Sequence, residues 1–272
     1  MEEPDELDLH IDILINEELS KLITHKIGPF TCQFLKYDTA KGLMPFASGI
    51  MVELGDSHFI LTASHVIEDW SDSNKLFIEI ENGHISVVGK ASGTETGERI
   101  DVAYIKLKDE LIPILRKWYR FITAEQLLHH NKIFDEGNYC AYGFPVVNFK
   151  IKSEIAKSVG SAYFMRPTAD KVFEFYKLSP LSHYILEFHG KPINIKTNQA
   201  EKIKTEHYGL SGGGLWYTKI NFVHNRIISK AQLIGIMTEF RKGKYECLIA
   251  NRVEIILALI EQNEGIKIKR RL

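Results

Sequence analysis

The sequence predicts an all-β protein made of two six-stranded antiparallel β-barrels, with a helical N-terminal extension and a C-terminal helix. Three observations support this prediction. Short β-rich runs, most of them bounded by turn signals, fall into two groups along the 272 residues. Helical spacing of apolar residues occurs only near the two ends and in the middle of the chain. Strands and helices do not alternate, as they would in a sheet built from βαβ units.

Helices are predicted at both ends of the chain. Residues 1–28 form the N-terminal extension, in which residues 5–26 place leucine and isoleucine at roughly helical intervals before a Gly-Pro stop signal. The segment NRVEIILALIEQNEG, residues 251–265, is predicted to be a helix that Gly265 ends.

Two groups of strand candidates define the two predicted barrels. The first group occupies residues 29–134 and consists of PFTCQFLKY, FASGIMVEL, SHFILTASHV, KLFIEIE, HISVVGKA and DVAYIKL. Residues 108–134 are predicted to be a helical or irregular linker. The second group occupies residues 135–272, together with the C-terminal helix, and consists of NYCAYGFPV, SAYFMRP, SHYILEF, GGLWYTKI, AQLIGIMTEF and YECLIANR.

Composition and charge exclude several classes of protein. A formal net charge of −1 gives no bulk attraction for nucleic acid or for an anionic membrane. Cys32, Cys140 and Cys247 are too few and too scattered for a disulfide framework or a zinc site, which favours a reducing compartment. The N-terminus lacks the apolar core of a signal peptide, and no apolar run approaches the roughly 18 residues of a membrane span. We therefore expect a cytoplasmic protein with no metal and no cofactor.

A glycine-rich run, EHYGLSGGGLWY at residues 206–217, is the most informative stretch of the chain. Tyr208 and the apolar residues around it indicate a segment anchored in a core rather than a flexible linker. The run lacks the lysine of a P-loop and the GxGxxG of a dinucleotide loop. It matches the G-x-S-x-G elbow of α/β-hydrolases literally, but that fold needs an acid and then a histidine after the serine. Only His224 follows Ser211, with no acid between them.

A histidine and an aspartate precede Ser211 in the chain. His65 lies at the end of ILTASHV, a predicted buried strand, and Asp101 opens DVAYIKL, a predicted alternating strand. The order His, Asp, Ser is that of chymotrypsin-type serine peptidases. A lone histidine would more often be a satisfied core residue, but the matching Asp and Ser segments favour a catalytic interpretation.

Three motifs carry a resemblance to a known family. LTASHV resembles L-T-A-A-H-C, DVAYIKL resembles D-I-A-L-L-K-L, and GLSGG resembles G-D-S-G-G. Over roughly residues 29–262 the chain looks like a trypsin-like, chymotrypsin-fold serine peptidase of the cysteine-poor, intracellular bacterial type. Val66 and Ser48 stand where this resemblance expects a disulfide, and Leu210 replaces the aspartate that captures a freed N-terminus in secreted members.

The resemblance implies specific roles. Ser211 would be the nucleophile, His65 its general base and Asp101 the group that orients His65. The backbone N–H groups of Gly209 and Ser211 would form the oxyanion hole. Five residues would contact the substrate: Thr205, Thr238, Glu239, Phe240 and Leu248.

The resemblance also bears on specificity. Thr205 stands where an acid would select basic side chains, so we expect a small or aliphatic residue before the cleaved bond. Glu206 and Glu239 leave a basic preference open, because a shift of one residue in the alignment would bring an acid into the pocket.

The sequence thus predicts a serine endopeptidase that acts through an acyl-enzyme intermediate. Its expected partners are a protein or peptide substrate and a regulatory protein, in a bacterial stress or anti-phage defence setting. The alternative is a catalytically silent protease-fold protein that serves as a binding module.

Overall fold

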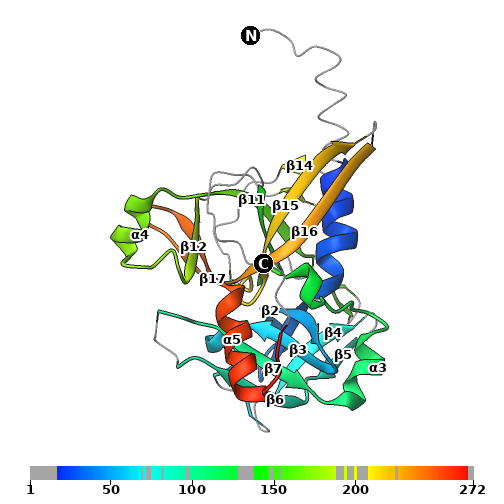
Figure 1. Ribbon diagram of the computed structural model, residues 1–272. Helices are drawn as coiled ribbons and strands as arrows, with labels where there is room; N and C mark the ends of the chain where they lie inside the picture. The colour runs from blue at the N-terminus through cyan, green and yellow to red at the C-terminus, as the bar shows by residue number, and fades with distance from the viewer. Residues whose placement is uncertain are drawn as a thin grey trace.

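The structure is a computed structural model, and Figure 1 shows how its elements are arranged. The residues that it describes are 17–68, 70–71, 75–80, 83–95, 99–127, 138–146, 150–152, 155–157, 159–187, 193–194, 199–200, 208–223 and 226–268. The chain is mostly β, with two sheets stacked one above the other and a few helices around them.

The first sheet has seven antiparallel strands in the order β5-β4-β1-β2-β3-β7-β6. Their bounds are β1 Thr31–Asp38, β2 Gly42–Leu54, β3 Ser57–Thr62, β4 Leu76–Ile80, β5 Gly83–Ser86, β6 Gly89–Gly93 and β7 Ala103–Leu107. Alternating burial places one face of these strands on a shared core that includes Phe34, Met51, Ile60 and Ile105.

The first sheet curls, but its strands do not pair into a closed barrel. Its two edge strands, β5 and β6, are consecutive in the chain and are separated only by Val87 and Val88. The Val87 N–H donates to the Leu76 carbonyl on β4, and the Lys108 N–H donates to the Val88 carbonyl. No pairing among the described strands joins β5 directly to β6. The predicted first barrel is therefore present as a curled seven-stranded sheet.

The second sheet contains a closed six-stranded barrel, as predicted for this half of the chain. The order β12-β17-β16-β15-β8-β11 returns to its start because β11 also pairs with β12. The bounds are β8 Asn138–Gly143, β11 Ser161–Pro167, β12 His183–Glu187, β15 Gly214–Val223, β16 Arg226–Arg241 and β17 Cys247–Arg252. Two short strands extend the sheet beyond β11, and a separate hairpin lies between β8 and β11 in the chain: β13 Ile193–Asn194, β14 Gln199–Ala200, β9 Lys150–Lys152 and β10 Ile155–Lys157.

Helices at both ends of the chain join the two sheets. Residues 17–22 are helical and continue into the π-helix η1, Ile23–Ile27, and the 3₁₀ turn η2, Gly28–Phe30. The C-terminal helix α5, Val253–Glu264, ends at Gly265 as predicted and packs against β7, β16 and β17. One core cluster collects apolar residues from both helices and both sheets, so the two halves share buried surface.

The segment between the sheets is helical and irregular, as predicted, where it is described. It contains the 3₁₀ turn η3 Asp109–Leu111, the short helix α3 Ile112–Leu115 and the 3₁₀ turn η4 Ala124–Gln126. Thr123 caps η4 in a capping box with Gln126.

Two short helices were not predicted. The expected strand through His65 ends earlier: β3 stops at Thr62, and α2 occupies Ser64–Ile67. Helix α4, Asp170–Tyr176, lies on the outside of the barrel (Figure 1), and its own Val172 and Phe173 are buried. No helix in the described part of the chain is long and apolar enough to span a bilayer.

Candidate functional site

His65 and Asp101 form a two-point contact at the end of the first sheet nearest the barrel. Helix α2 begins directly after β3, which places His65 in its first turn, while Asp101 lies two residues before β7. The imidazole Nδ1 lies 2.6 Å from one carboxylate oxygen of Asp101. The backbone N–H of His65 donates to the other oxygen over 3.0 Å. Because a carboxylate only accepts, this contact places a proton on Nδ1 and leaves the Nε2 lone pair of a neutral ring free.

Residues of the closed barrel and of the segment after α4 hold the loop that carries Asp101. The Asp101 N–H donates to the side-chain oxygen of Asn251 on β17 over 3.0 Å. The Arg99 carbonyl accepts from the imidazole Nε2 of His183 on β12 over 2.7 Å. The Arg99 guanidinium donates to the carbonyl of Lys177, which follows α4. Since three contacts fix this loop from across the molecule, the carboxylate is held in place before any substrate arrives.

The loop of Ser211 takes backbone conformations that favour glycine. Gly209 and Gly212 have φ angles of +96° and +81°, in the left-handed region that side chains avoid. A Cβ on Gly212 would also collide with the Ser48 carbonyl and the Thr62 hydroxyl. The Gly212 N–H donates to the Met237 carbonyl over 2.7 Å, which fastens the loop to β16.

Ser48, a buried residue on β2, connects the first sheet to this loop. Its hydroxyl donates to the Gly209 carbonyl over 2.7 Å and accepts from the Phe144 N–H over 2.9 Å. Its N–H donates to the Ser211 carbonyl over 2.8 Å. The sequence predicts no role for Ser48 beyond its place in the absent disulfide. No sequence signal pointed to the role of the hydroxyl.

In the part of the chain that the structure describes, Ser211 is linked to the His–Asp pair only through Thr238, which lines the same cavity as His65 and Asp101, whereas Ser211 does not. The Ser211 hydroxyl donates to the Thr238 carbonyl over 3.3 Å, and no hydrogen bond to His65 exists among the described residues. Within the same described part, no hydrogen bond uses the N–H of Gly209 or Ser211. Gly209 is buried and Ser211 is half-buried.

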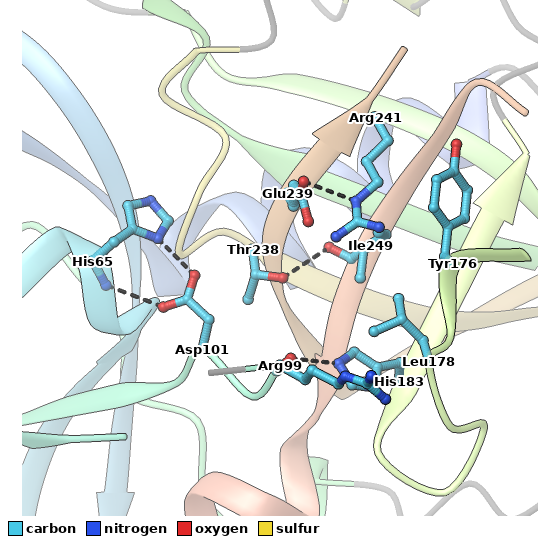
Figure 2. Close-up of a pocket in the computed structure, with 10 residues that line it drawn as sticks. All are labelled: His65, Arg99, Asp101, Tyr176, Leu178, His183, Thr238, Glu239, Arg241 and Ile249. Carbon is cyan, nitrogen blue, oxygen red and sulfur yellow. Dashed lines mark hydrogen bonds and ion pairs between the residues drawn. The ribbon is translucent and has the colours of Figure 1, made fainter. Parts of the chain in front are cut away.

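A cavity of about 450 Å³ opens next to His65 and Asp101. Figure 2 shows these two residues on one side of it, with Arg241 and Tyr176 on the other. Its lining comes from α2, the loop before β7, α4 and the residues after it, and strands β12, β16 and β17: His65, Arg99, Asp101, Tyr176, Leu178, His183, Thr238, Glu239, Arg241 and Ile249.

The predicted substrate contacts divide into three groups. Thr238 and Glu239 line the cavity. Leu248 is buried in the barrel core, and Phe240 packs against that core instead. Thr205 and Glu206 lie outside the described residues. Tyr208 was expected to anchor the glycine run in a core, but its side chain is 73% exposed, whereas Leu210 is buried.

The thiols do not compete with Ser211 as nucleophiles. Cys32, Cys140 and Cys247 are free and buried. Burial raises the pKa of Cys32 and Cys140 well above the usual range and that of Cys247 to about 11. Because the thiolate is the reactive form, these residues are chemically inert near neutral pH. Across the described residues, no three His, Cys, Asp or Glu side chains come together to hold a metal ion.

Neither a family model nor a curated protein matches this chain. The closed barrel beside a curled sheet is compatible with a chymotrypsin-like fold. The interpretation of the site therefore depends on the contacts described above.

Acid should destabilise the protein through His183. Burial lowers the pKa of this imidazole, whose Nε2–H must donate to the Arg99 carbonyl. The unfolded chain binds a proton at this residue below about pH 6.5 while the folded chain resists it, so the free energy of unfolding falls as the pH drops below that value. His183→Gln, which keeps a donor, should flatten the fall in Tm measured between about pH 7.5 and pH 5. An identical slope in both proteins would contradict this role.

Proposed function

We propose that the protein is a serine endopeptidase of chymotrypsin-like architecture. The single observation that carries the proposal is the two-point contact between His65 and Asp101, with Nδ1 and the carboxylate 2.6 Å apart. This contact holds the imidazole with Nε2 as the free acceptor, which a general base for a serine hydroxyl requires. A closed barrel beside a curled sheet is compatible with this architecture.

The proposed reaction begins when the Ser211 hydroxyl leaves the Thr238 carbonyl and donates to His65 Nε2. Hydrogen bonds of this kind are often long or absent until substrate binds. Oγ attacks the peptide carbonyl while Nε2 takes its proton, and Asp101 stabilises the resulting imidazolium. The N–H groups of Gly209 and Ser211 stabilise the oxyanion. His65 then gives this proton to the leaving amine, and the acyl group stays on Ser211 Oγ. In the second half of the reaction, His65 takes a proton from a water molecule as its oxygen attacks the acyl carbonyl. His65 returns that proton to Ser211 Oγ as the ester bond breaks.

A catalytically silent binding module is the second candidate. The observation that favours it is the engagement of the Ser211 hydroxyl by the Thr238 carbonyl rather than by His65. In this case the cavity would bind a protein segment without cleaving it. An intracellular bacterial setting and a regulatory protein partner belong to either version of the proposal.

A fluorophosphonate probe distinguishes these two candidates. We expect the folded protein to be labelled at one site, which peptide mapping assigns to Ser211, because only a serine activated by a base reacts rapidly. Ser211→Ala should abolish labelling, and Ser182→Ala, which alters another partly accessible hydroxyl, should leave it unchanged. Labelling of neither wild type nor control would favour the binding module.

A further inference from the structure

The cavity beside His65 has a charged lining as well as an apolar one. Its apolar side is formed by Tyr176, Leu178 and Ile249, and its ionisable side chains include Arg99, Asp101, Glu239 and Arg241. Because the cavity shares His65 and Asp101 with the proposed catalytic centre, any group bound in it lies within a few residues of the bond that would be cleaved.

Three of these four charges already have partners. Both oxygens of Asp101 accept from His65. Glu239 lies 2.8 Å from Nε of Arg241, and this contact raises the pKa of the guanidinium. The same guanidinium lies 4.8 Å from the centre of the Tyr176 ring. The Glu239–Arg241 pair is therefore neutral as a unit and is held against an aromatic wall.

Among these four charged side chains, Arg99 is the one without an oppositely charged partner in the described part of the chain. Its guanidinium donates to the uncharged Lys177 carbonyl over 2.6 Å, and no carboxylate lies within ion-pair distance of it among the described residues. His183 holds the backbone of Arg99 through the 2.7 Å contact with its carbonyl. Since hydrogen bonds hold both the backbone carbonyl and the guanidinium of Arg99, little conformational entropy is lost when the side chain binds an anion.

We propose that this cavity binds an acidic side chain of the substrate, with Arg99 as its counter-charge. The inference rests on the proposed peptidase function and names the class of substrate. A guanidinium presents donors in a planar fork that matches a carboxylate, and one bond to Lys177 leaves other donors of the fork free. The apolar wall of Tyr176, Leu178 and Ile249 can contact the methylene groups of aspartate or glutamate.

Cleavage of a mixed peptide library, read by mass spectrometry, tests the preference. We expect aspartate or glutamate to be enriched at one position close to the cleaved bond. Three peptides that differ only there, carrying Glu, Gln or Lys, then give kcat/KM for each. A charge-assisted hydrogen bond at a partly exposed site predicts a preference of about tenfold for Glu over Gln. The preference should shrink as salt is added.

Two variants of Arg99 and one control sharpen this test. Arg99→Gln keeps a donor for the Lys177 carbonyl but removes the charge, so the preference should disappear. Arg99→Glu should reverse it in favour of the Lys peptide. Lys171→Gln makes the same change of charge on α4 outside the cavity lining and should leave the preference intact. Because the Arg99 side chain also helps to hold the Asp101 loop, the preference is read as the ratio of kcat/KM between peptides within each variant. Fluorophosphonate labelling of each variant reports separately whether the catalytic centre is assembled.

The outcomes separate the two proposals. Normal labelling with no acidic preference, or with a preference that Arg99→Gln leaves unchanged, overturns this inference and spares the peptidase. If wild type is not labelled, the peptidase proposal fails, and pooled octapeptides with a central Glu, Gln or Lys are tested for binding by fluorescence polarisation. Tighter binding of the Glu pool that Arg99→Gln removes would then support the cavity's preference, and equal binding of all pools would overturn it.

Discussion

Replacing Asp101 with asparagine should lower kcat/KM by about 10⁴-fold. The carboxylate accepts from both the ring and the backbone of His65. An asparagine oxygen can still accept from the backbone N–H, but its amide donates where a carboxylate accepts. The imidazole would then turn its Nδ1 lone pair toward the amide and carry its proton on Nε2, where it cannot act as a base.

The measurement is the rate of fluorophosphonate inactivation together with peptide turnover. Asp56→Asn makes the same chemical change in the exposed turn between β2 and β3 and should leave both rates near wild type. The Asn251 contact to the Asp101 backbone persists in the variant, so Tm should change little. Retention of more than about a tenth of the activity would show that Asp101 does not orient the base.

The sequence predicted regular elements best where a local signal begins or ends them. Gly265 ends α5 because a left-handed residue stops a helix without strain. The apolar run through His65 was predicted as one strand, yet β3 gives way to α2 after Ala63. Buried residues on both sides of that junction, such as Leu61 and Val66, fit a strand and a short helix equally well. Helix α4 was not predicted for a related reason, because a helix of about two turns is too short to show a clear helical spacing of apolar residues.

Closure of the sheets could not be predicted from the strand candidates. The barrel closes through two residue pairs between β11 and β12, Arg166 with Glu187 and Pro167 with Leu186. Neither pair has a signature in the sequence, because pairing between distant strands depends on how the whole sheet twists. The same candidates therefore predicted two barrels where the structure has one barrel and one curled sheet.

The prediction of the site rested on the order of His65, Asp101 and Ser211 and on the motifs around them in the chain, whereas the residues near them only in space gave no sequence signal. The cavity combines Arg99, in the loop before β7, with Tyr176 on α4 and His183 on β12, residues that carry no functional signal in the sequence. Only the fold brings them together. Ser48 is a second example, since its hydroxyl acts on a loop 161 residues away.

Replacing Ser48 with alanine should disrupt the Ser211 loop more than its small size implies. The hydroxyl bridges the Gly209 carbonyl and the Phe144 N–H in a fully buried position. Its loss leaves both groups unpaired and should cost about 1–3 kcal/mol of stability for each. Because the Gly209 carbonyl would lose its anchor, the N–H groups of Gly209 and Ser211 on either side of it would no longer be held in the positions proposed for oxyanion donors. We expect kcat to fall by about 10²–10³-fold, the range for a lost oxyanion donor.

Thr62→Val is the matched control for this prediction. The Thr62 hydroxyl donates to the Ser48 carbonyl over 2.9 Å, so the variant also loses one buried hydrogen bond of the first sheet. It leaves the contacts of Ser48 with Gly209 and Phe144 in place. Both variants should lower Tm, but only Ser48→Ala should lower kcat with KM nearly unchanged, because the oxyanion donors act in the transition state. An equal loss of kcat in both would mean that Ser48 supports the fold without positioning the loop.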